Sequence, residues 1–293
     1  MPTRVRFELF ASGYCLSPGD MILPGEHPRL GRIRTYATWG LIQHPTEGYI
    51  LFDTGYGDRF LEEVRRFPER LLAWALPVRY DRAEAAHLQL SRLGIAPEEI
   101  RYVLLSHFHG DHMGGLADFP NARIICTESA YVHALSLSRL RGALSGFLQG
   151  LLPEGFEQRT TFVERLPGYG RTEKPALGPG TDLLGDGSLV LMPLPGHARG
   201  QFGVWMRTED KEDMLLAADA CWMSRSFQEM RLPAPAARVS MDNPREYVES
   251  LTALHRLYQM RPDMPILPCH CPDVYAAWVT GSGPFTSTLL SHV

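Results

Sequence analysis

One short segment, Leu104–Gly115, constrains this chain more than any other part of its sequence, which there reads LLSHFHGDHMGG. Within six positions it holds four side chains of the kinds that bind metal ions: His107, His109, Asp111 and His112. The apolar run Arg101–Leu105 overlaps its start and predicts a buried strand. The four side chains therefore follow the end of a strand, where a rigid sheet can present ligands.

The spacing of these four residues favours two metal ions. Residues two apart on an extended chain point the same way, so His107 and His109 can bind one ion together. Gly110 lets the chain turn, and Asp111 and His112 can then face a second ion. Neutral imidazole and carboxylate are ligands that zinc takes in proteins, and the segment is therefore interpreted as part of a metal centre.

Three further candidate ligands lie in loops that follow predicted strands: His197 after Leu189–Met192, Asp219 after Met214–Ala217, and His270 after Pro265–Leu267. Taken singly, each has an ordinary alternative. A lone histidine after glycine is common in loops, and a lone aspartate at the end of a strand is usually a cap or turn residue.

The remaining elements predict a mixed α/β architecture, because strands and helices alternate in both halves and each half contains hairpins. Further strands are predicted over Val5–Phe10, Thr35–Gln43, Tyr49–Phe52, Arg123–Cys126 and Phe202–Met206. Helices are predicted from Asp81 to about Leu93, with Glu84 completing a capping box, from Asn243 to about Met260, and from Pro272 onward.

Two segments rich in Gly and Pro interrupt this pattern. They are the loop Gly13–Gly31 and a long insertion at about 138–187, and both are expected to cover the metal site as a lid. The insertion carries apolar pairs at Phe147-Leu148 and Leu151-Leu152. An equally weighted alternative is that these pairs only pack a surface helix on the core, or form the contact of a homodimer.

Composition limits the classes of partner and compartment. The net charge of −4 comes with no long basic run, which gives no reason to expect nucleic acid. No apolar stretch reaches the ~20 residues that a membrane span needs, and the N-terminus lacks the apolar core of a signal peptide. Five scattered cysteines form no disulfide framework, so we expect a reducing cytoplasm.

The candidate motifs, taken in order, carry a family resemblance. Asp53 in the sequence LFDTG, the HxHxDH run, His197, Asp219 and His270 resemble the five motifs of the metallo-β-lactamase fold superfamily. The resemblance implies a four-layer αβ/βα sandwich, built as a single domain over residues 1–293, with two metal ions at one edge of its sheets.

The resemblance also implies a role for each residue. One metal is held by three histidines: His107, His109 and His197. The other is held by a second group: Asp111, His112 and His270. Asp219 bridges both metals, as does a hydroxide opposite it. Asp53 orients a ligand histidine through a hydrogen bond.

The function implied is that of a dinuclear hydrolase that cleaves an ester-type or lactone-type bond in a small molecule. The bridging hydroxide attacks the carbonyl, and Asp111 or a metal-bound water returns the proton. Zinc is the expected metal, although manganese, iron or cobalt would suit the same ligands. Neither fold nor metals name the substrate, since this machinery serves many bonds.

Within the superfamily the chain resembles the N-acyl homoserine lactonase-like group. Lactonases of that group commonly carry a tyrosine three residues after the bridging aspartate, where this chain has Trp222. We expect Trp222 to line the substrate pocket and to disfavour homoserine lactones, because an indole has no hydroxyl. Simple packing is the alternative for this residue. The neighbouring Cys221, Cys269 and Cys271 are expected to be small buried residues.

Other classes within the resemblance stay open. A persulfide-dioxygenase-like oxidoreductase would use a single iron held by two histidines and one aspartate, and the complete second ligand set argues against it. A phosphodiesterase acting on a small molecule fits the metals, while a polynucleotide substrate does not fit the acidic charge balance. A non-catalytic binding protein usually requires lost ligands, and none is missing here.

Overall fold

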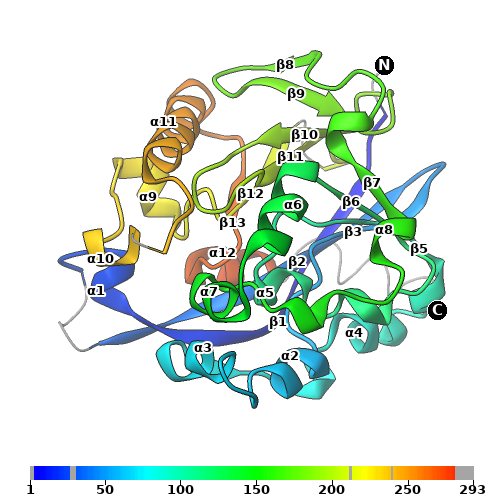
Figure 1. Ribbon diagram of the computed structural model, residues 1–293. Coiled ribbons are helices and arrows are strands. Elements are labelled where there is room, and N and C mark those ends of the chain that lie inside the picture. Colours follow the sequence, from blue (N-terminus) through cyan, green and yellow to red (C-terminus); the bar gives the residue numbers. More distant parts are fainter. Residues whose placement is uncertain (1–2, 27–30, 211–212, 239, 281–293) are drawn as a thin grey trace.

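The computed structural model of the chain describes residues 3–26, 31–210, 213–238 and 240–280. Within these ranges the strands form two mixed sheets that face each other, with helices on the outer sides (Figure 1). The first sheet has the strand order β4-β1-β2-β3-β5-β6-β7, and the second has the order β13-β12-β11-β10-β9-β8.

The strands of the first sheet are β1 (Arg6–Pro18), β2 (Arg32–His44), β3 (Gly48–Phe52), β4 (Val78–Arg79), β5 (Ile100–Leu104), β6 (Arg123–Cys126) and β7 (Thr160–Phe162). Those of the second are β8 (Thr172–Lys174), β9 (Gly178–Asp182), β10 (Leu189–Pro193), β11 (Phe202–Met206), β12 (Met214–Ala218) and β13 (Ile266–Pro268).

The α-helices are α1 (Gly19–Ile22), α2 (Asp58–Glu63), α3 (Arg70–Ala75), α4 (Ala86–Arg92), α5 (Gly110–Met113), α6 (Glu128–Ser136), α7 (Arg139–Ser145), α8 (Phe156–Arg159), α9 (Ser224–Glu229), α10 (Pro235–Arg238), α11 (Pro244–Met260) and α12 (Pro272–Trp278). The 3₁₀ turns are η1 (Arg82–Glu84), η2 (Pro97–Glu99), η3 (Leu116–Asp118), η4 (Gln149–Leu151) and η5 (Val163–Arg165).

Three clusters of buried apolar side chains lie between the layers. The central cluster joins the two sheets, with Ile42 and Phe52 from the first and Val204 and Leu216 from the second. A second cluster packs α2, α4, α6 and α8 on the outer face of the first sheet. The third packs α9 and α11 on the outer face of the second sheet. Helices, sheet, sheet and helices thus make four layers, which confirms the predicted αβ/βα sandwich.

Helix α11 illustrates how the sequence builds an outer layer. The Asn243 side chain accepts hydrogen bonds from the first backbone N–H groups, and Pro244 occupies the first turn, as predicted. The buried face then repeats every three or four residues, through Tyr247, Leu251, Leu254 and Leu257. That spacing places one side of the helix against the second sheet.

Strand direction brings the candidate ligands to one edge. Strands β3 and β5 are parallel, so Asp53 and His107, which follow them, lie at the same end of the first sheet. In the second sheet β12 and β13 are parallel, and β10 runs the same way because it is antiparallel to β11, which is antiparallel to β12. The loops that carry His197, Asp219 and His270 therefore meet at one edge.

The loop predicted over Gly13–Gly31 is wrong for its first part. Residues up to Pro18 continue β1 and pair with β2, beyond a bulge between Ala11 and Tyr14. Gly13 sits in that bulge with φ of 80°, and a Cβ there would lie 2.3 Å from a backbone oxygen of β4. The glycine therefore bends a strand and does not end it. Residues 27–30 of the predicted loop lie outside the described residues.

The helix predicted from Asp81 is also shorter than expected. Asp81 accepts a hydrogen bond from the N–H of Ala83, but only the 3₁₀ turn η1 follows it. The backbone of Ala85 then leaves the helical region at ψ of 138°, and α4 begins at Ala86. The capping side chain serves a single turn, and a new helix starts after it.

The segment 138–187 divides into two parts. Its second part supplies sheet strands, since β7 pairs with β6 and the β8–β9 hairpin pairs with β10. Its first part, which holds α7 and η4, lies beside the candidate ligands. Phe147, Leu148 and Leu151 are buried in the outer core cluster, so they pack as core residues and offer no exposed dimer contact. The lid role of this segment and of the loop Gly13–Gly31 stays a prediction.

Candidate metal centre

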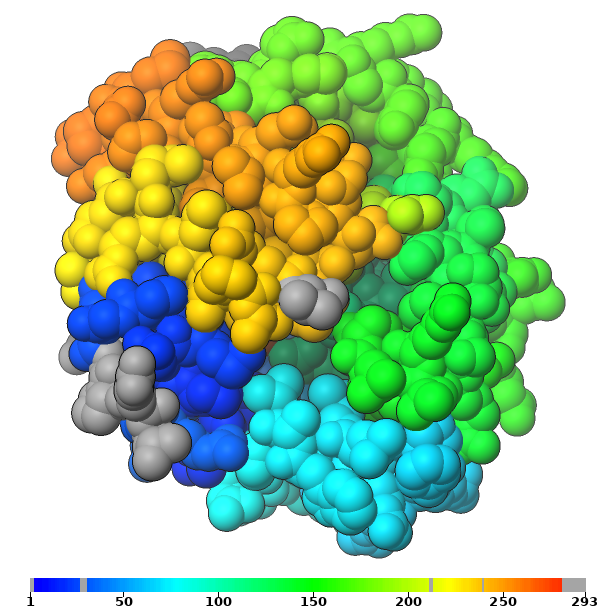
Figure 2. Space-filling view, turned by 60° about the vertical axis from the view of Figure 1, so that its left-hand side comes forward, coloured from blue at the N-terminus to red at the C-terminus, as the bar shows by residue number. Residues whose placement is uncertain are grey.

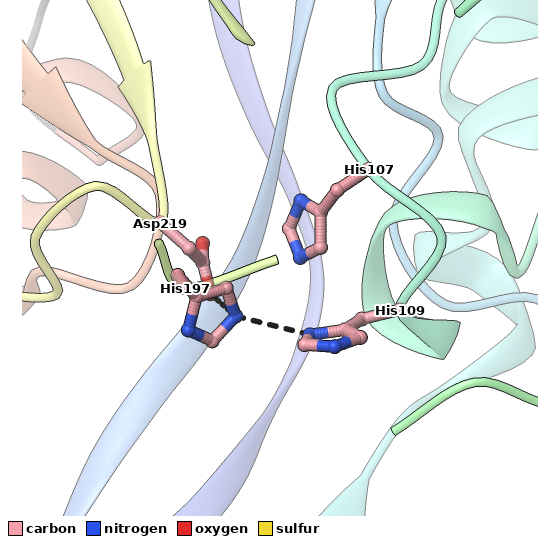
Figure 3. A group of neighbouring side chains, drawn as sticks. All are labelled: His107, His109, His197 and Asp219. Carbon is pink, nitrogen blue, oxygen red and sulfur yellow. Dashed lines mark hydrogen bonds and ion pairs between the residues drawn. The ribbon is translucent and has the colours of Figure 1, made fainter. Parts of the chain in front are cut away.

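The first group of candidate ligands combines both sheets. His107 and His109 come from the loop after β5, while His197 and Asp219 come from the second sheet, and the four side chains point towards one another (Figure 3). One potential ligand atom from each lies within 4.8 Å of all the others. His197 Nε2 is 3.0 Å from His109 Nδ1 and 3.1 Å from Asp219 Oδ2.

The second group comprises Asp111, His112 and His270, again with potential ligand atoms within 4.8 Å of one another. His270 Nε2 lies 3.6 Å from Asp111 Oδ2, and His112 Nε2 lies 3.9 Å from Asp111 Oδ1. Asp111 and His112 belong to α5, which begins immediately after His109. The short helix thus separates the residues that face one group from those that face the other.

Asp219 touches both groups. Its Oδ2 is 3.1 Å from His197 Nε2 in the first group and 3.0 Å from His270 Nε2 in the second, and its Oδ1 is 3.3 Å from His112 Nε2, also in the second. The preceding Ala218 has φ of 47°, a left-handed conformation that side chains rarely adopt. This turn at the end of β12 projects the carboxylate between the two groups, and the neighbouring structure must stabilise it.

The donor set fits divalent metal ions. Four buried side-chain atoms in the two groups have no hydrogen-bond partner within the described structure: His107 Nε2, His112 Nε2, His197 Nδ1 and Asp219 Oδ1. Buried polar atoms normally have a partner, because leaving one unpaired is costly. Imidazole nitrogens and carboxylate oxygens that converge in this way match the ligand chemistry of zinc and related ions.

Hydrogen bonds behind the ligands fix their orientation. Asp53 is fully buried with φ of 59°, and its Oδ2 accepts a 2.7 Å hydrogen bond from His112 Nδ1. The backbone N–H and the hydroxyl of Ser106 also donate to Asp53, both at 2.8 Å. The Ser106 hydroxyl can then accept from His107 Nδ1, 3.0 Å away. These contacts leave Nε2 of both histidines free to face a cation.

His270 is oriented by backbone. Its Nδ1 donates a 2.7 Å hydrogen bond to the carbonyl oxygen of Tyr36 on β2, which directs Nε2 towards Asp219. Tyr36 itself is held by stacking on Tyr275 of α12, with ring centroids 3.6 Å apart. The first sheet therefore positions a ligand that belongs to the second.

A family model described as the metallo-β-lactamase superfamily matches residues 32–220, which span Asp53, the HxHxDH run, His197 and Asp219. The chain belongs to the metallo-β-lactamase superfamily. This confirms the resemblance that the sequence motifs predicted.

Relatives within the superfamily include lactonases. The N-acyl homoserine lactonase AttM of Agrobacterium fabrum is 28% identical over 236 residues, which cover 80% of this chain and 82% of that protein. The structure of an N-acyl homoserine lactone hydrolase with the product N-hexanoyl-L-homoserine at its catalytic metal center matches with a TM-score of 0.70 and 19% identity, covering 94% of this chain and 97% of that one. AidC, a dizinc quorum-quenching lactonase, matches with a TM-score of 0.61 and 16% identity, covering 93% of this chain and 89% of that one. The two structural matches support the superfamily fold.

Burial and charge act differently on the individual ligands. Burial, together with neighbouring histidines, holds the pKa of His107 and of His109 well below the ordinary value, so these rings are neutral. Burial opposes protonation of His270 as well, but the Asp219 carboxylate raises its pKa to about 9. Burial alone would raise the pKa of Asp219, yet the surrounding histidines, His270 foremost, hold it well below its usual range.

The pKa of His112 is raised, as is that of His270. Burial disfavours its charged form, but the carboxylates around it, that of Asp53 foremost, raise its pKa well above the ordinary value. The acidic side of the centre therefore attracts positive charge. A metal cation that binds there would take the place of these protons.

Two glycines allow close packing around His109. A Cβ on Gly110 would lie 2.7 Å from the ring of Phe60. The glycine is needed here for the close approach of that ring, and not for its backbone conformation, since its φ is not positive. Gly146 ends α7 with φ of 94°, and a Cβ there would lie 3.2 Å from the ring of His109. The Gly146 carbonyl accepts a 2.9 Å hydrogen bond from the N–H of Gly110. The end of α7 is thus fastened to the ligand loop.

Trp222 lies beside the ligands. Its indole Nε1 donates a 3.2 Å hydrogen bond to Asp219 Oδ2, and its ring stands edge-on to that of His197 with centroids 5.6 Å apart. The side chain is partly buried and also packs against Tyr247. The indole therefore supports the orientation of Asp219, while its contact with a substrate stays a prediction.

The predicted structural cysteines are buried. Cys221, Cys269 and Cys271 are free thiols with at most 4% exposure. Cys269 Sγ, however, lies within 4.8 Å of polar atoms of Asp53 and His112, closer to the centre than packing alone would suggest. Its thiol pKa is raised well above the ordinary value by burial, which keeps the sulfur protonated.

A cavity of about 360 Å³ opens onto the first ligand group and is lined by His109 and His197. Its walls come from α6, from α7 and from the loop before α11. Figure 2 shows a hollow on this face, bordered by the green of α7, the cyan of α3 and the orange of the start of α11.

No helix among the described residues is long and apolar enough to cross a bilayer.

Proposed function

We propose that this protein is a dinuclear, zinc-dependent hydrolase that cleaves an ester or lactone bond in a small molecule. The observation that carries the proposal is the carboxylate of Asp219, whose Oδ2 lies 3.1 Å from His197 Nε2 of one set of metal-binding side chains and 3.0 Å from His270 Nε2 of the other. The ligand sets proposed are His107, His109 and His197 for one ion and Asp111, His112 and His270 for the other, with Asp219 shared.

The relatives support the choice of bond. AttM is named as a lactonase and AidC as a dizinc lactonase, and both match most of this chain. When bound, two divalent cations lower the pKa of a water between them and polarise a nearby carbonyl. The lactonase-like hydrolase is therefore preferred over the iron oxidoreductase and the phosphodiesterase.

The side chains have separate tasks in this proposal. Asp53 and the Tyr36 carbonyl hold His112 and His270 in the tautomer that leaves Nε2 available. Asp111, whose side chain is 21% exposed, is the carboxylate of the centre most open to solvent and can return a proton to the leaving group. Trp222 narrows the site next to Asp219 and presents an apolar face to the substrate.

The experiment is a hydrolysis screen of the zinc-loaded protein against lactones, aryl esters, thioesters, phosphotriesters and β-lactams, with bound metal measured in the same samples. We expect about two zinc ions per chain and turnover of an ester or lactone. The Asp219→Ala protein is the matched control for turnover by contaminants. One iron per chain with no second metal after reconstitution would instead favour the oxidoreductase.

The proposal also includes the domain organisation, the location and the oligomeric state of the protein. The core cluster shared by the two sheets supports a single domain. The free, buried state of all five cysteines is compatible with the predicted cytoplasmic location. A homodimer also stays a prediction.

A further inference from the structure

The cavity beside His109 and His197 has one charged side chain that nothing neutralises. Helix α7 lines it through Arg141, Leu144 and Ser145, and the last two lie three and four residues after Arg141 on the same face of the helix. Leu137, just before the helix, adds to the lining. Within the described part of the chain, the guanidinium of Arg141 has no hydrogen bond or ion pair, and the side chain is exposed.

Two other arginines near the cavity, Arg139 and Arg199, each have a carboxylate partner. Arg139, two residues earlier, donates from Nε and Nη2 to both oxygens of Glu69, at 2.9 and 2.8 Å. Arg199, which also lines the cavity, donates from Nε to Asp242 Oδ2 at 3.1 Å. Each of these two positive charges has its own carboxylate. Arg141 therefore leaves the cavity with one uncompensated positive charge.

The carboxylate of Asp242 is not available to Arg141 as a partner. Its Oδ2 is bound to Arg199, and its Oδ1 lies 3.4 Å from His133 Nε2. Asp242 thus already contacts two other groups. A ligand that enters the cavity would meet Arg141 as the free cation.

The rest of the cavity is largely apolar. Phe108 and Phe147 are buried beneath it, and Leu144 on α7 and Leu137 in the link between α6 and α7 add apolar surface. A substrate whose scissile bond lies at the metal centre could therefore place an apolar chain along this wall. The far end of such a chain would reach the guanidinium, whose planar fork matches a carboxylate.

We propose that Arg141 selects substrates that carry a carboxylate, separated by an apolar chain from the ester or lactone bond. This inference rests on the proposed function, because it assumes that the scissile bond lies next to His109 and His197. The guanidinium can hold both oxygens of a carboxylate in a bidentate pair.

The test compares two ligands that differ only in charge and cannot be hydrolysed as esters. They are octanedioic acid mono-N-methylamide and N-methyloctanamide, titrated calorimetrically into the zinc-loaded protein. We expect the charged amide to bind about fivefold or more tightly than the neutral one, since a hydrogen bond to a charged partner adds to the affinity. In Arg141→Gln the two affinities should become equal within about twofold, and Arg141→Lys should retain part of the preference.

Arg171→Gln is the matched control, because it removes an exposed arginine that does not line the cavity. It should leave the preference unchanged, and thermal melting should show all variants folded. A preference that survives Arg141→Gln would mean that the metal binds the carboxylate, and it overturns the proposal. Equal affinities in the unaltered protein, or no binding of either amide at about 10 mM, overturn it as well.

A second arm separates this inference from the proposed function. It measures hydrolysis of monophenyl octanedioate and phenyl octanoate by the same proteins. Equal turnover of both esters would support the hydrolase and overturn the role of Arg141. Arg141-dependent binding of the charged amide without hydrolysis of either ester would support the carboxylate site and count against the hydrolase.

Discussion

At the scale of single residues, the Asp219 carboxylate holds the centre together, because it contacts His197 of the first ligand group and His270 of the second. We predict that Asp219→Ala loses both metals or nearly all activity. Elemental analysis and kcat/KM measure the two effects on the same preparation. An Asp219→Ala protein that keeps two metals and full turnover would refute the bridging role.

Asp53→Ala serves as the comparison, since Asp53 touches His112 and Ser106 but belongs to the layer behind the ligands. Changes in that layer typically cost about 10–100-fold in metal affinity or activity. The loss should therefore be smaller than for Asp219→Ala. Equal losses in the two variants would mean that Asp53 is needed for folding of the centre.

Trp222 tests the specificity of the site. Its indole N–H is committed to Asp219, so it cannot also donate freely to a substrate oxyanion. We predict poor turnover of acyl homoserine lactones, and Trp222→Tyr should raise it relative to aryl esters, because a phenol offers a donor in another place. The measurement is kcat/KM for both substrates in both proteins. Efficient lactone turnover that the substitution leaves unchanged would make Trp222 a packing residue.

Asp186, which is not among the candidate ligands, sets a pH dependence of stability. Burial would raise its pKa, but hydrogen bonds from Ser188, and from His44, lower it to about 2 from the ordinary 3.8. The folded state thus favours the ionised form, and the stabilisation is present above about pH 4 and is lost as pH falls towards 2.

We predict that Asp186→Asn lowers the free energy of unfolding at pH 7 by about 1 kcal/mol, a small effect because the side chain is partly exposed. The difference from the unaltered protein should shrink between pH 4 and pH 2. Denaturant unfolding at a series of pH values measures it, with Asp263→Asn as an exposed control. A difference that does not vary with pH would assign the effect to packing.

Residue chemistry explains how much of the centre could be predicted. The candidate ligands and Asp53 each stand in a short motif after a strand, and the structure brings them together. Ser106 was missed, although a serine beside the HxH run is a detectable signal. The contribution of Tyr36 is a backbone carbonyl, which any residue supplies, so the sequence holds no trace of it.

At the scale of elements, the end of α7 controls the position of His109. We predict that Gly146→Ala destabilises the protein by about 1–2 kcal/mol, because its φ of 94° strains any residue with a Cβ, and that it also displaces His109, whose ring lies 3.2 Å from the added carbon. Metal content and activity should therefore fall together with the melting temperature.

Gly185→Ala separates strain from contact. Gly185 has φ of 79°, and a Cβ there would meet nothing within 4 Å. It should lower the melting temperature by a similar amount while metal content and turnover stay unchanged. Equal loss of metal in both variants would mean that α7 acts only through overall stability.

Some helices and strands were harder to predict than the ligands. These are the elements whose course depends on a glycine or whose strands are very short. Gly13 reads as a loop residue, yet it forms a bulge inside β1 because the neighbouring strand approaches its Cα. The strands β7 to β9 are three to five residues long and lack a clear alternation, so their segment resembled an insertion. The partner of β7 is β6, more than thirty residues earlier in the chain, and local pattern cannot reveal such a pairing.

At the scale of the whole molecule, the proposed metals join the two halves of the sandwich. One sheet supplies the segment that holds His107, His109, Asp111 and His112, and the other supplies His197, Asp219 and His270. A cation held by both would stabilise the folded state by mass action, because the unfolded chain does not assemble the site. Within the described residues, buried nitrogens such as His107 Nε2 and His197 Nδ1 have no hydrogen-bond partner in the protein itself.

We therefore predict that chelation lowers the melting temperature by about 5–15 °C, which corresponds to roughly 3–4 kcal/mol of binding free energy at 100–1,000 times the dissociation constant. Scanning calorimetry with and without a chelator, followed by addition of zinc, measures the loss and its recovery. Asp219→Ala is the control, and it should melt near the temperature of the chelated protein and respond little to chelator. If complete removal of metal leaves the melting temperature unchanged, the two sheets are held by the apolar core between them alone, and the metals serve chemistry without contributing to stability.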